Sequence, residues 1–286
     1  MIGLGIMGSA MAANLLRAGF RVVGYDAVRA RNRRHARAGG IVASSAQEVA
    51  AAADILITSL PSAKALGSVS NAISGRKIVV ETSTLPIPDK QRARKVLAAK
   101  GATLLDCPLS GTGAQAKTGD LVVFGSGSPA AWRRIQPVLR GFSRAQYYVG
   151  ALGNGSKMKF IANLLVAIHN VSSAEALVLA RRSGLGAALA LKVLADSAAS
   201  SRMLQVRGPM MVRRTYRPAT MSNRLWQKDM TIIGDFVRSL KSPAPLFQAT
   251  RAVYRATLGD LAEADTAAVA AVLERRAAMT RRRTRN

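Results

Sequence analysis

The feature that most constrains the fold is a glycine-rich segment at the amino terminus. Residues 3–8 read GLGIMG, a match to the pattern G-x-G-x-x-G, and a helical pattern over residues 9–18 follows and ends at Gly19. In this pattern the glycines permit a tight turn, close approach of the backbone to a pyrophosphate and close helix–strand packing. The helix N-terminus then offers N–H groups and a positive dipole to phosphates. We therefore predict a dinucleotide-binding βαβ unit whose contacts are Gly3, Leu4, Gly5, Ile6, Met7 and Gly8.

The residue that ends the second strand bears on which dinucleotide is bound. The expected strand over residues 21–25 is followed by Asp26, which comes 18 residues after Gly8. A carboxylate here can accept hydrogen bonds from the adenine-ribose hydroxyls, whereas a 2′-phosphate would face a negative charge. Asp26 thus favours NAD. NADP stays possible, because the arginines that follow either accommodate a phosphate or form a solvated helix face: Arg29, Arg31, Arg33 and Arg34.

The first strand of this unit has little sequence to form it. Only Met1 and Ile2 precede Gly3, whereas a strand usually runs about five residues. We expect either a shortened strand or a natural chain that starts upstream, and we expect an apolar N-terminal extension to raise stability.

The order of apolar segments predicts the architecture. Short apolar runs at 21–25, 55–59, 78–81, 103–106 and 121–124 alternate with helical patterns at 9–18, 29–38, 46–52, 64–72 and 89–99. Such alternation predicts a parallel sheet with helices on both faces. After Val149 only helical patterns follow, at 156–182, 187–195, 226–240, 245–258 and 265–276. The fold class is thus an α/β Rossmann-type, doubly wound domain (1–150) followed by an all-α substrate and dimerisation domain (151–286).

The chain is very basic, with 42 Lys and Arg against 15 acidic residues and a net charge of +27. Residues 1–150 hold 20 basic and 7 acidic residues, and residues 151–286 hold 22 and 8. An even spread favours compositional drift over a binding patch, although generic adhesion to polyanions remains open. We expect no sequence-specific nucleic-acid partner.

Cysteine content and hydropathy exclude several other classes. The single cysteine, Cys107, excludes an internal disulfide framework and a multi-cysteine zinc site, so we expect no bound metal. No continuous apolar run reaches about 18 residues, so we expect no membrane association. Cytoplasmic residence is the simplest interpretation.

Candidate chemistry lies outside the two histidines. We expect His35 at the surface and His169 in helix packing, neither of them catalytic. Lys159 and Asn163 are four residues apart at the start of the long helix and so share a face. A lysine beside apolar groups can relay protons near neutral pH, and an asparagine can hold it or the substrate. The loop at 106–114 could bind a carboxylate through backbone N–H groups and the hydroxyls of Ser110 and Thr112. From spacing alone, ordinary helix and turn residues explain both segments about as well.

Taken together, these segments resemble the β-hydroxyacid dehydrogenase family, which contains 3-hydroxyisobutyrate dehydrogenase, tartronate semialdehyde reductase and the glyoxylate/succinic semialdehyde reductases. More distantly, the chain resembles 6-phosphogluconate dehydrogenase. The matching stretches keep the family order over almost the whole chain: 3–15, Leu60-Pro61-Ser62, Ser83-Thr84, 106–119, 153–163 and Lys228-Asp229.

The resemblance implies roles for individual residues. Lys159 falls on the family's catalytic lysine and Asn163 on its asparagine partner. Ser110, Gly111 and Thr112 fall on the substrate-carboxylate loop. Cofactor contacts fall on Leu60, Pro61, Ser83, Thr84 and Lys228. The implied activity is hydride transfer between NAD(P) and a small anionic hydroxy acid or semialdehyde by a homo-oligomer, most often a dimer.

Two positions depart from the family pattern and leave the substrate open. Thr112 replaces a common second glycine, and Ala162 stands where several members have Asn or His. An imine reductase-like relative is one alternative, although that branch is expected to lack the lysine at position 159. The other is a non-catalytic cofactor-binding protein that associates with nucleic acid, as the basic charge allows.

Overall fold

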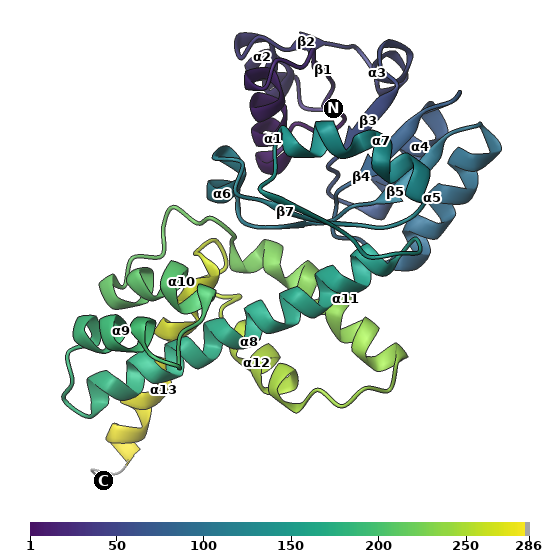
Figure 1. Cartoon of the computed structure of the whole chain (residues 1–286). Helices are drawn as coiled ribbons and strands as arrows, with labels where there is room; N and C mark the ends of the chain where they lie inside the picture. Colours follow the sequence, from purple (N-terminus) through teal and green to yellow (C-terminus); the bar gives the residue numbers. More distant parts are fainter. Residues whose placement is uncertain (284–286) are drawn as a thin grey trace. The chain divides into compact units, whose positions relative to one another are not determined.

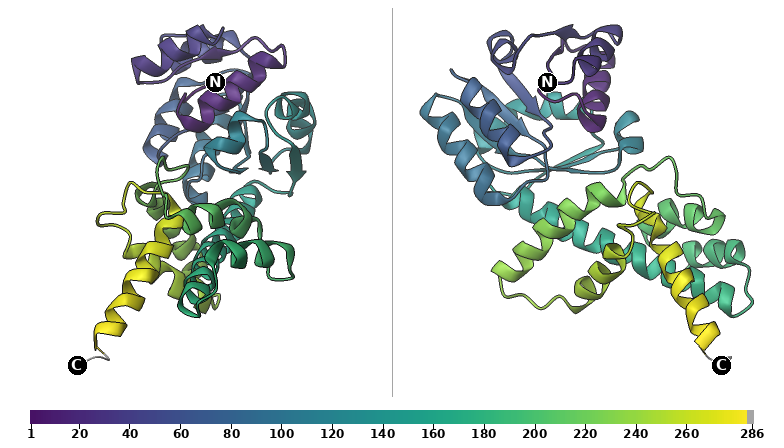
Figure 2. Two further views of the ribbon diagram at one scale, coloured as in Figure 1. Left: turned by 90° about the vertical axis from the view of Figure 1, so that its left-hand side faces the viewer. Right: turned by 180° about the vertical axis from the view of Figure 1, so that it is seen from behind.

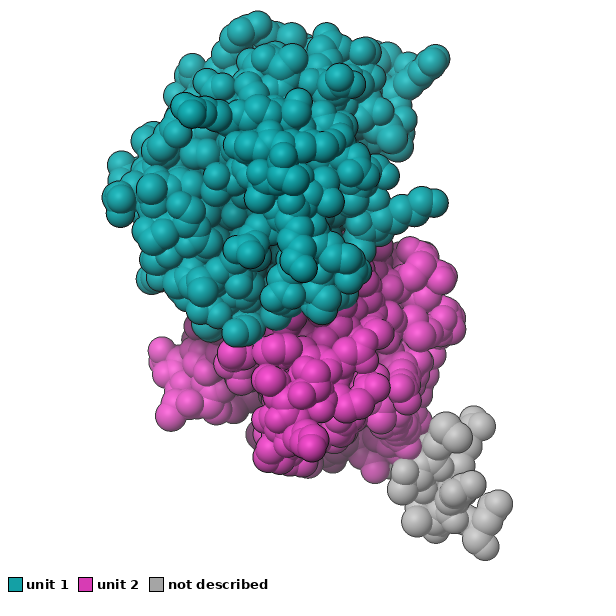
Figure 3. All heavy atoms as spheres, turned by 90° about the vertical axis from the view of Figure 1, so that its right-hand side faces the viewer, with its two compact units in different colours: residues 1–159 teal, residues 160–286 magenta. Residues whose placement is uncertain are grey.

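The computed structural model describes the backbone of residues 1–283 and the side chains of residues 1–278 (Figure 1). The chain forms two compact units, 1–159 and 160–286, which Figure 3 colours separately. The long helix α8 (Asn154–Arg182) carries the chain from one unit into the other. The last three residues of the expected second domain lie outside the described range.

Unit 1 is built on eight short strands, in which parallel pairing prevails. β1 pairs with β2, β3 with β4, β4 with β5, and β7 with β8, all in parallel, while β6 pairs with β7 in antiparallel fashion. Isolated bridges from Ile2 to Tyr25 and Thr58, and from Asp106 to Ser126, link these groups. The strands are β1 (Val23–Gly24), β2 (Ile41–Val42), β3 (Ile55–Thr58), β4 (Ile78–Glu81), β5 (Thr103–Asp106), β6 (Leu109–Ser110), β7 (Val122–Gly125) and β8 (Ala145–Tyr148).

Helices cover both faces of the sheet, as the sequence predicts. Alternate strand residues point to opposite faces, so Ile57, Val80 and Leu105 join one core cluster and their neighbours Leu56, Val79 and Leu104 join the other. The first cluster packs under α1 (Ile6–Arg17), α6 (Gly113–Lys117) and α7 (Pro129–Arg140). The second packs under α3 (Ala46–Ala52), α4 (Ala63–Ala72) and α5 (Ile87–Ala99), and α2 (Arg29–Arg37) lies beside β2.

Several elements differ from the sequence prediction. The sheet is mixed, because β7 is antiparallel to β6 and, at the Asp106–Ser126 bridge, to β5. The link 111–121 holds only the five-residue helix α6, and a parallel crossover needs a dozen or more residues. Helices α7 and α10 (Arg202–Arg213) were not predicted, because Pro137 and Pro209 interrupt their patterns. Strand β8 is half exposed and therefore lacks an apolar run.

Within the described residues, every named element of unit 2 is a helix, and both further views show these helices (Figure 2). Two aromatic pairs lie in its core: the rings of Phe160 and Phe236 are 5.3 Å apart, and those of Trp226 and Tyr254 are 6.1 Å apart. Beyond α8 and α10 its helices are α9 (Ala187–Asp196), α11 (Asn223–Ser239), α12 (Pro245–Arg255), the 3₁₀ turn η1 (Thr266–Ala268) and α13 (Val269–Arg283).

Helix α8 is the one described helix that is long and apolar enough to cross a membrane by length and composition. This is weak evidence for a span, because the core helix of a water-soluble protein passes the same test.

Ile2 lies between two neighbouring segments of the sheet. Ile2 bridges to both Tyr25 and Thr58, and its side chain is 1 % exposed. The α-amino group of Met1 donates a hydrogen bond to the carbonyl oxygen of Val23 at 2.6 Å. Burial lowers the pKa of this amino group from its ordinary value of 8.0 to about 5.

We expect the amino group of Met1 to make the stability of this chain depend on pH. Between pH 5 and 8 the unfolded chain binds the proton that the folded chain excludes, so the free energy of unfolding rises with pH across this window. The full change is about 4 kcal/mol. Urea unfolding of the chain at intervals from pH 5 to 8 measures it.

A chain extended by four or five apolar residues is the control, because an amide replaces the buried amine. His35 contributes a slope of the same sign, since burial lowers its pKa too, but that slope is common to both chains. We expect the extended chain to have the higher melting temperature and the smaller slope. Equal slopes would contradict the prediction.

Candidate active site

The glycine loop leaves room and N–H groups for an anion. Gly3 has φ +91°, and a Cβ there would lie 2.2 Å from the carbonyl oxygen of Ser59. A Cβ on Gly8 would lie 1.9 Å from the carbonyl oxygen of Gly3, whereas one on Gly5 would meet nothing within 4 Å. Gly5 is the N-cap of α1 and supplies no side-chain cap, and the first turn has no acidic residue. The loop therefore fits a pyrophosphate at the helix N-terminus.

Asp26 is held against this loop. Its carboxylate accepts hydrogen bonds from the backbone N–H groups of Leu4 and Val28, each at 2.8 Å. The guanidinium of Arg31 lies 3.2 Å from Oδ2 and 3.3 Å from Oδ1. Among the four candidate arginines, the structure thus brings Arg31 to the carboxylate. Its side chain is 46 % exposed, so it can swing away from Asp26 or toward a phosphate.

Two further loops expected to contact the cofactor are tied to each other. They follow the neighbouring parallel strands β3 and β4, so they lie at the same edge of the sheet. The N–H of Leu60 donates to Ser83 Oγ at 2.8 Å, and the N–H of Ser83 donates to Glu81 Oε1 at 2.8 Å. Ligands bind in open α/β sheets at this carboxyl edge, so the position suits the expected role of Leu60, Pro61, Ser83 and Thr84.

The expected substrate loop, Ser110–Thr112, leads from β6 into α6. Gly111 has φ +135°, which favours glycine at this position. The N–H of Thr112 donates to Gln115 Oε1 at 3.0 Å, in a capping box. The amide of Gln115 in turn donates to Asp120 at 3.2 Å, and Asp120 pairs with Arg144 at 2.8 Å. The N–H of Thr112 is therefore engaged within the loop, and its orientation depends on Gln115.

Lys159 lies one turn into α8, and the start of this helix is anchored to the sheet. The N–H of Ser156 donates to Asp106 Oδ2 at 2.8 Å, and its hydroxyl donates to Oδ1 at 3.0 Å. The N–H of Gly155 donates to Ser126 Oγ at 3.0 Å. Lys159 is 8 % exposed, whereas Lys157 is exposed and donates to Asn154. This difference in exposure favours Lys159 over Lys157 as the candidate acid/base.

Within unit 2, the polar residues Asn163, Lys228 and Asp229 lie close together. Asn163 donates through Nδ2 to Asp229 Oδ2 at 3.0 Å, and both side chains are buried. Lys228 Nζ lies 3.9 Å from Asp229 Oδ1, and its side chain is 44 % exposed. Asp229 therefore links the two residues that the sequence had named separately. The family resemblance includes Lys228-Asp229 but implies no role for the carboxylate of Asp229.

Two buried residues were misjudged or overlooked. His35 was expected at the surface, but it is 5 % exposed, with Nε2 3.3 Å from the carbonyl oxygen of Val22. Its imidazole occupies the space left by Gly24 and Gly40, where a Cβ would lie 2.6 and 2.1 Å from the ring. Lys90 was not singled out, although it shares the apolar face of α5 with Ala93 and Leu97. A lysine on such a face is the signal that could have found it.

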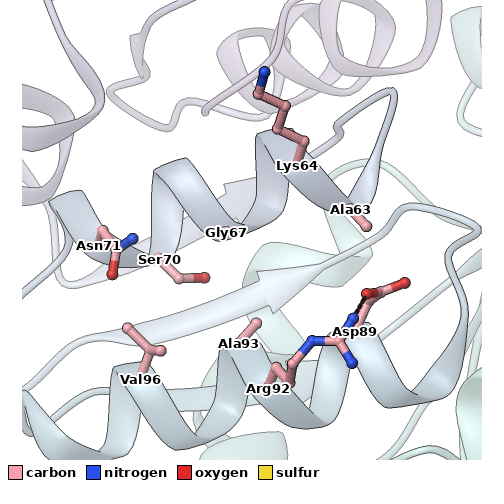
Figure 4. Close-up of a pocket in the computed structure, with 9 residues that line it drawn as sticks. All are labelled: Ala63, Lys64, Gly67, Ser70, Asn71, Asp89, Arg92, Ala93 and Val96. Carbon is pink, nitrogen blue, oxygen red and sulfur yellow. Dashed lines mark hydrogen bonds and ion pairs between the residues drawn. The ribbon is translucent and has the colours of Figure 1, made fainter.

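A groove lies between α4 and α5 (Figure 4). In the close-up, Lys64 points away from the groove and Arg92 pairs with Asp89. None of the residues expected in the site lines it.

Comparison with known proteins places this geometry in context. Residues 1–150 match the family described as the NAD binding domain of 6-phosphogluconate dehydrogenase. Residues 153–273 match the NAD-binding family of NADP-dependent 3-hydroxyisobutyrate dehydrogenase. L-threonate dehydrogenase of Cupriavidus necator is 32 % identical over 279 residues, 94 % of each chain. 2-(Hydroxymethyl)glutarate dehydrogenase of Eubacterium barkeri is 34 % identical over 72 % of this chain and 71 % of its own.

A solved structure agrees over nearly the whole chain. The 3-hydroxyisobutyrate dehydrogenase of Mycobacterium tuberculosis, solved with L-serine, is similar with a TM-score of 0.86 and 28 % identity. The match covers 95 % of this chain and 97 % of that one.

Proposed function

Because the chain belongs to the β-hydroxyacid dehydrogenase family, we propose that it transfers hydride between NAD(P) and a small hydroxy acid or the corresponding semialdehyde. The observation that carries the proposal is the glycine loop with open space at Gly5, together with a buried lysine one turn into α8. When bound, the nicotinamide supplies the hydride chemistry. The chain supplies binding, orientation and proton transfer.

Lys159 is the proposed acid/base. In the oxidation direction, its neutral amine accepts the proton of the substrate hydroxyl as the hydride leaves the carbon that bears this hydroxyl. In the reduction direction its ammonium returns that proton to the carbonyl oxygen. Asn163, held by Asp229, is proposed to orient the substrate, and Lys228 to contact the nicotinamide end of the cofactor.

The substrate is proposed to be anionic. The Ser110–Thr112 loop is proposed to bind this carboxylate through groups other than the N–H of Thr112, which donates to Gln115. The net charge of +27 attracts anions over a long range. The printed names of the relatives include threonate, hydroxymethylglutarate and hydroxyisobutyrate dehydrogenases. All three substrates are hydroxy acids with a carboxylate.

A substrate panel tests the proposal. Small hydroxy acids with NAD and NADP, and semialdehydes with NADH and NADPH, are assayed at 340 nm. We expect turnover with at least one carboxylate substrate and none with its methyl ester. An enzyme that reduces cyclic imines and no semialdehyde would instead support the imine reductase alternative.

We expect NAD(H) to give the higher kcat/KM, because Asp26 faces the ribose site. Asp26→Asn should reduce or reverse the preference for NAD(H) over NADP(H). This variant has no carboxylate to repel a 2′-phosphate or to pair with Arg31. Arg31→Ala in the wild-type background should lower kcat/KM with NADP(H) more than with NAD(H). The measurement is kcat/KM for both cofactors with the best substrate.

Arg33→Ala is the matched control, because Arg33 lies on the same helix but no contact of it with Asp26 is seen. A wild-type preference for NADP(H) above about tenfold, or 1.4 kcal/mol, would contradict the prediction.

We also propose that the protein is a cytoplasmic homo-oligomer, with a dimer as the simplest assembly. Apolar side chains are exposed along unit 2, where α9 has no buried residue. They include Ile161, Leu165, Leu179, Leu185, Leu189 and Val193, each 47–69 % exposed. A second copy would remove this surface from water. Light scattering that gives a single 30.2 kDa species at micromolar concentration would contradict it.

A further inference from the structure

An ammonium and two carboxylates lie fully buried beneath the cofactor loops of unit 1. Lys90, Glu81 and Asp106, which we call the buried ion cluster, are each 0 % exposed. Lys90 Nζ lies 2.6 Å from Glu81 Oε2 and 2.7 Å from Asp106 Oδ1. It also donates to the carbonyl oxygen of Ser83 at 2.7 Å. The ammonium thus donates hydrogen bonds to Asp106 and Ser83 and forms an ion pair with Glu81.

The cluster keeps its charge inside the protein. Burial by itself would lower the pKa of Lys90, but Asp106 and Glu81 outweigh it and raise this pKa above its ordinary value. The ammonium is therefore charged at every pH at which the enzyme would work. A permanent charge needs fixed partners, because an unpaired buried charge is strongly destabilising.

The partners of Lys90 lead in two directions. On one side, the carbonyl oxygen of Ser83 accepts a hydrogen bond from the ammonium, and the Ser83 hydroxyl accepts one from the N–H of Leu60. Both cofactor loops therefore depend on Ser83. On the other side, Asp106 Oδ1 accepts a hydrogen bond from the ammonium. The same carboxylate accepts hydrogen bonds from the N–H and the hydroxyl of Ser156 in the first turn of α8. Lys159 follows three residues later on that helix.

We propose that Lys90 is a positioning residue that ties the cofactor loops to the start of the catalytic helix. It touches neither substrate nor cofactor. Its ammonium fixes the carbonyl of Ser83 and the orientation of the Asp106 carboxylate at the same time. The assignment of Lys159 and of the cofactor loops on which this inference rests is the proposed function above.

A purely stabilising role predicts a different result. Arg207 in unit 2 is a comparable buried cation: its side chain is 4 % exposed and pairs with Asp265, which is 0 % exposed. Its described partners, Asp265 and Thr220, belong to unit 2 and include no residue of the proposed site. Arg207→Met is therefore a matched control for the loss of one buried cation.

The test compares Lys90→Met with the double variant Lys90→Met/Glu81→Gln. Folding is checked by circular dichroism and thermal melts, the Kd of NADH by fluorescence, and kcat at saturating cofactor. In Lys90→Met we expect the Kd to rise at least fivefold and kcat to fall at least tenfold. The double variant removes the repulsion between the carboxylates of Glu81 and Asp106, so Asp106 should retain its hydrogen bonds from Ser156. Its kcat should recover at least threefold over Lys90→Met, while its Kd stays high because Ser83 still lacks the ammonium.

The outcomes are distinct. If Lys90→Met melts at a lower temperature but keeps the wild-type Kd and kcat below the melt, as we expect for Arg207→Met, the positioning role is overturned. If Lys90→Met does not fold, the double variant decides: a raised Kd supports the role, and wild-type values of both constants overturn it. Failure of the proposed function has another signature, because the wild-type chain would then turn over no member of the panel, while the Kd of NADH still tests the Ser83 side.

Discussion

Replacing Lys159 with Ala is expected to lower kcat by at least about a hundredfold, the low end of the contribution of a general acid or base. The proposed phosphate-binding loop is residues 3–8, so the Kd of NADH should change little. Lys159→Arg should recover little activity, because a guanidinium keeps its proton at neutral pH. Steady-state kinetics and NADH fluorescence titration, on variants shown to be folded, provide the measurement.

Lys157→Ala is the control for this experiment. Two residues along a helix rotate a side chain by about 200°, and Lys157 is exposed and pairs with Asn154. It should keep its activity within about twofold. If Lys157→Ala abolished turnover and Lys159→Ala were nearly silent, the assigned register of α8 would be wrong, and the roles given to Asn163 would fall with it.

The second large effect is expected at Gly5, where Val should raise the Kd of NADH at least about a hundredfold, or about 2.7 kcal/mol. A Cβ at this position meets no protein atom within 4 Å. The melting temperature should therefore stay nearly constant, while the new methyl groups fill the space that a pyrophosphate needs. NADH titration and a thermal melt on the same sample separate binding from folding.

Two other glycines frame this result. Gly67 also faces open space, but it lies in α4; Gly67→Ala should leave the Kd unchanged and stabilise the chain by up to about 1 kcal/mol. At Gly8 a Cβ would collide with the carbonyl oxygen of Gly3, so Gly8→Ala should lower the melting temperature itself. An unchanged Kd in Gly5→Val would show that the dinucleotide binds elsewhere.

Much of the fold was predictable because the signals are local. Strands β4 (Ile78–Glu81) and β5 (Thr103–Asp106) and helix α3 (Ala46–Ala52) have the predicted bounds, since continuous apolar runs and helical periodicity report directly on neighbouring residues. Where the local pattern is weak, prediction failed. Prolines within α7 and α10 obscured two stable helices, because tertiary packing outweighs the local cost of a proline.

The candidate site divides in the same way. The glycine loop, Asp26 and the candidate Lys159 could be predicted from motif spacing, because each lies within or next to the helix or strand that positions it. Which arginine reaches Asp26 did not follow, because four arginines share one helix. Only the folded geometry distinguishes Arg31.

The sequence by itself determined the βαβ unit with its glycine loop, the helices on both faces of the sheet and the helical second half, because glycine spacing and apolar periodicity act between near neighbours. Tertiary structure alone decided the burial of His35, the reversed direction of β7 and the cluster of Lys90 with Glu81 and Asp106. Asp106 is 16 residues from Lys90 and 50 from Ser156. Such contacts depend on where strands and helices end in space. Patterns among neighbouring residues do not show which distant residues will come into contact.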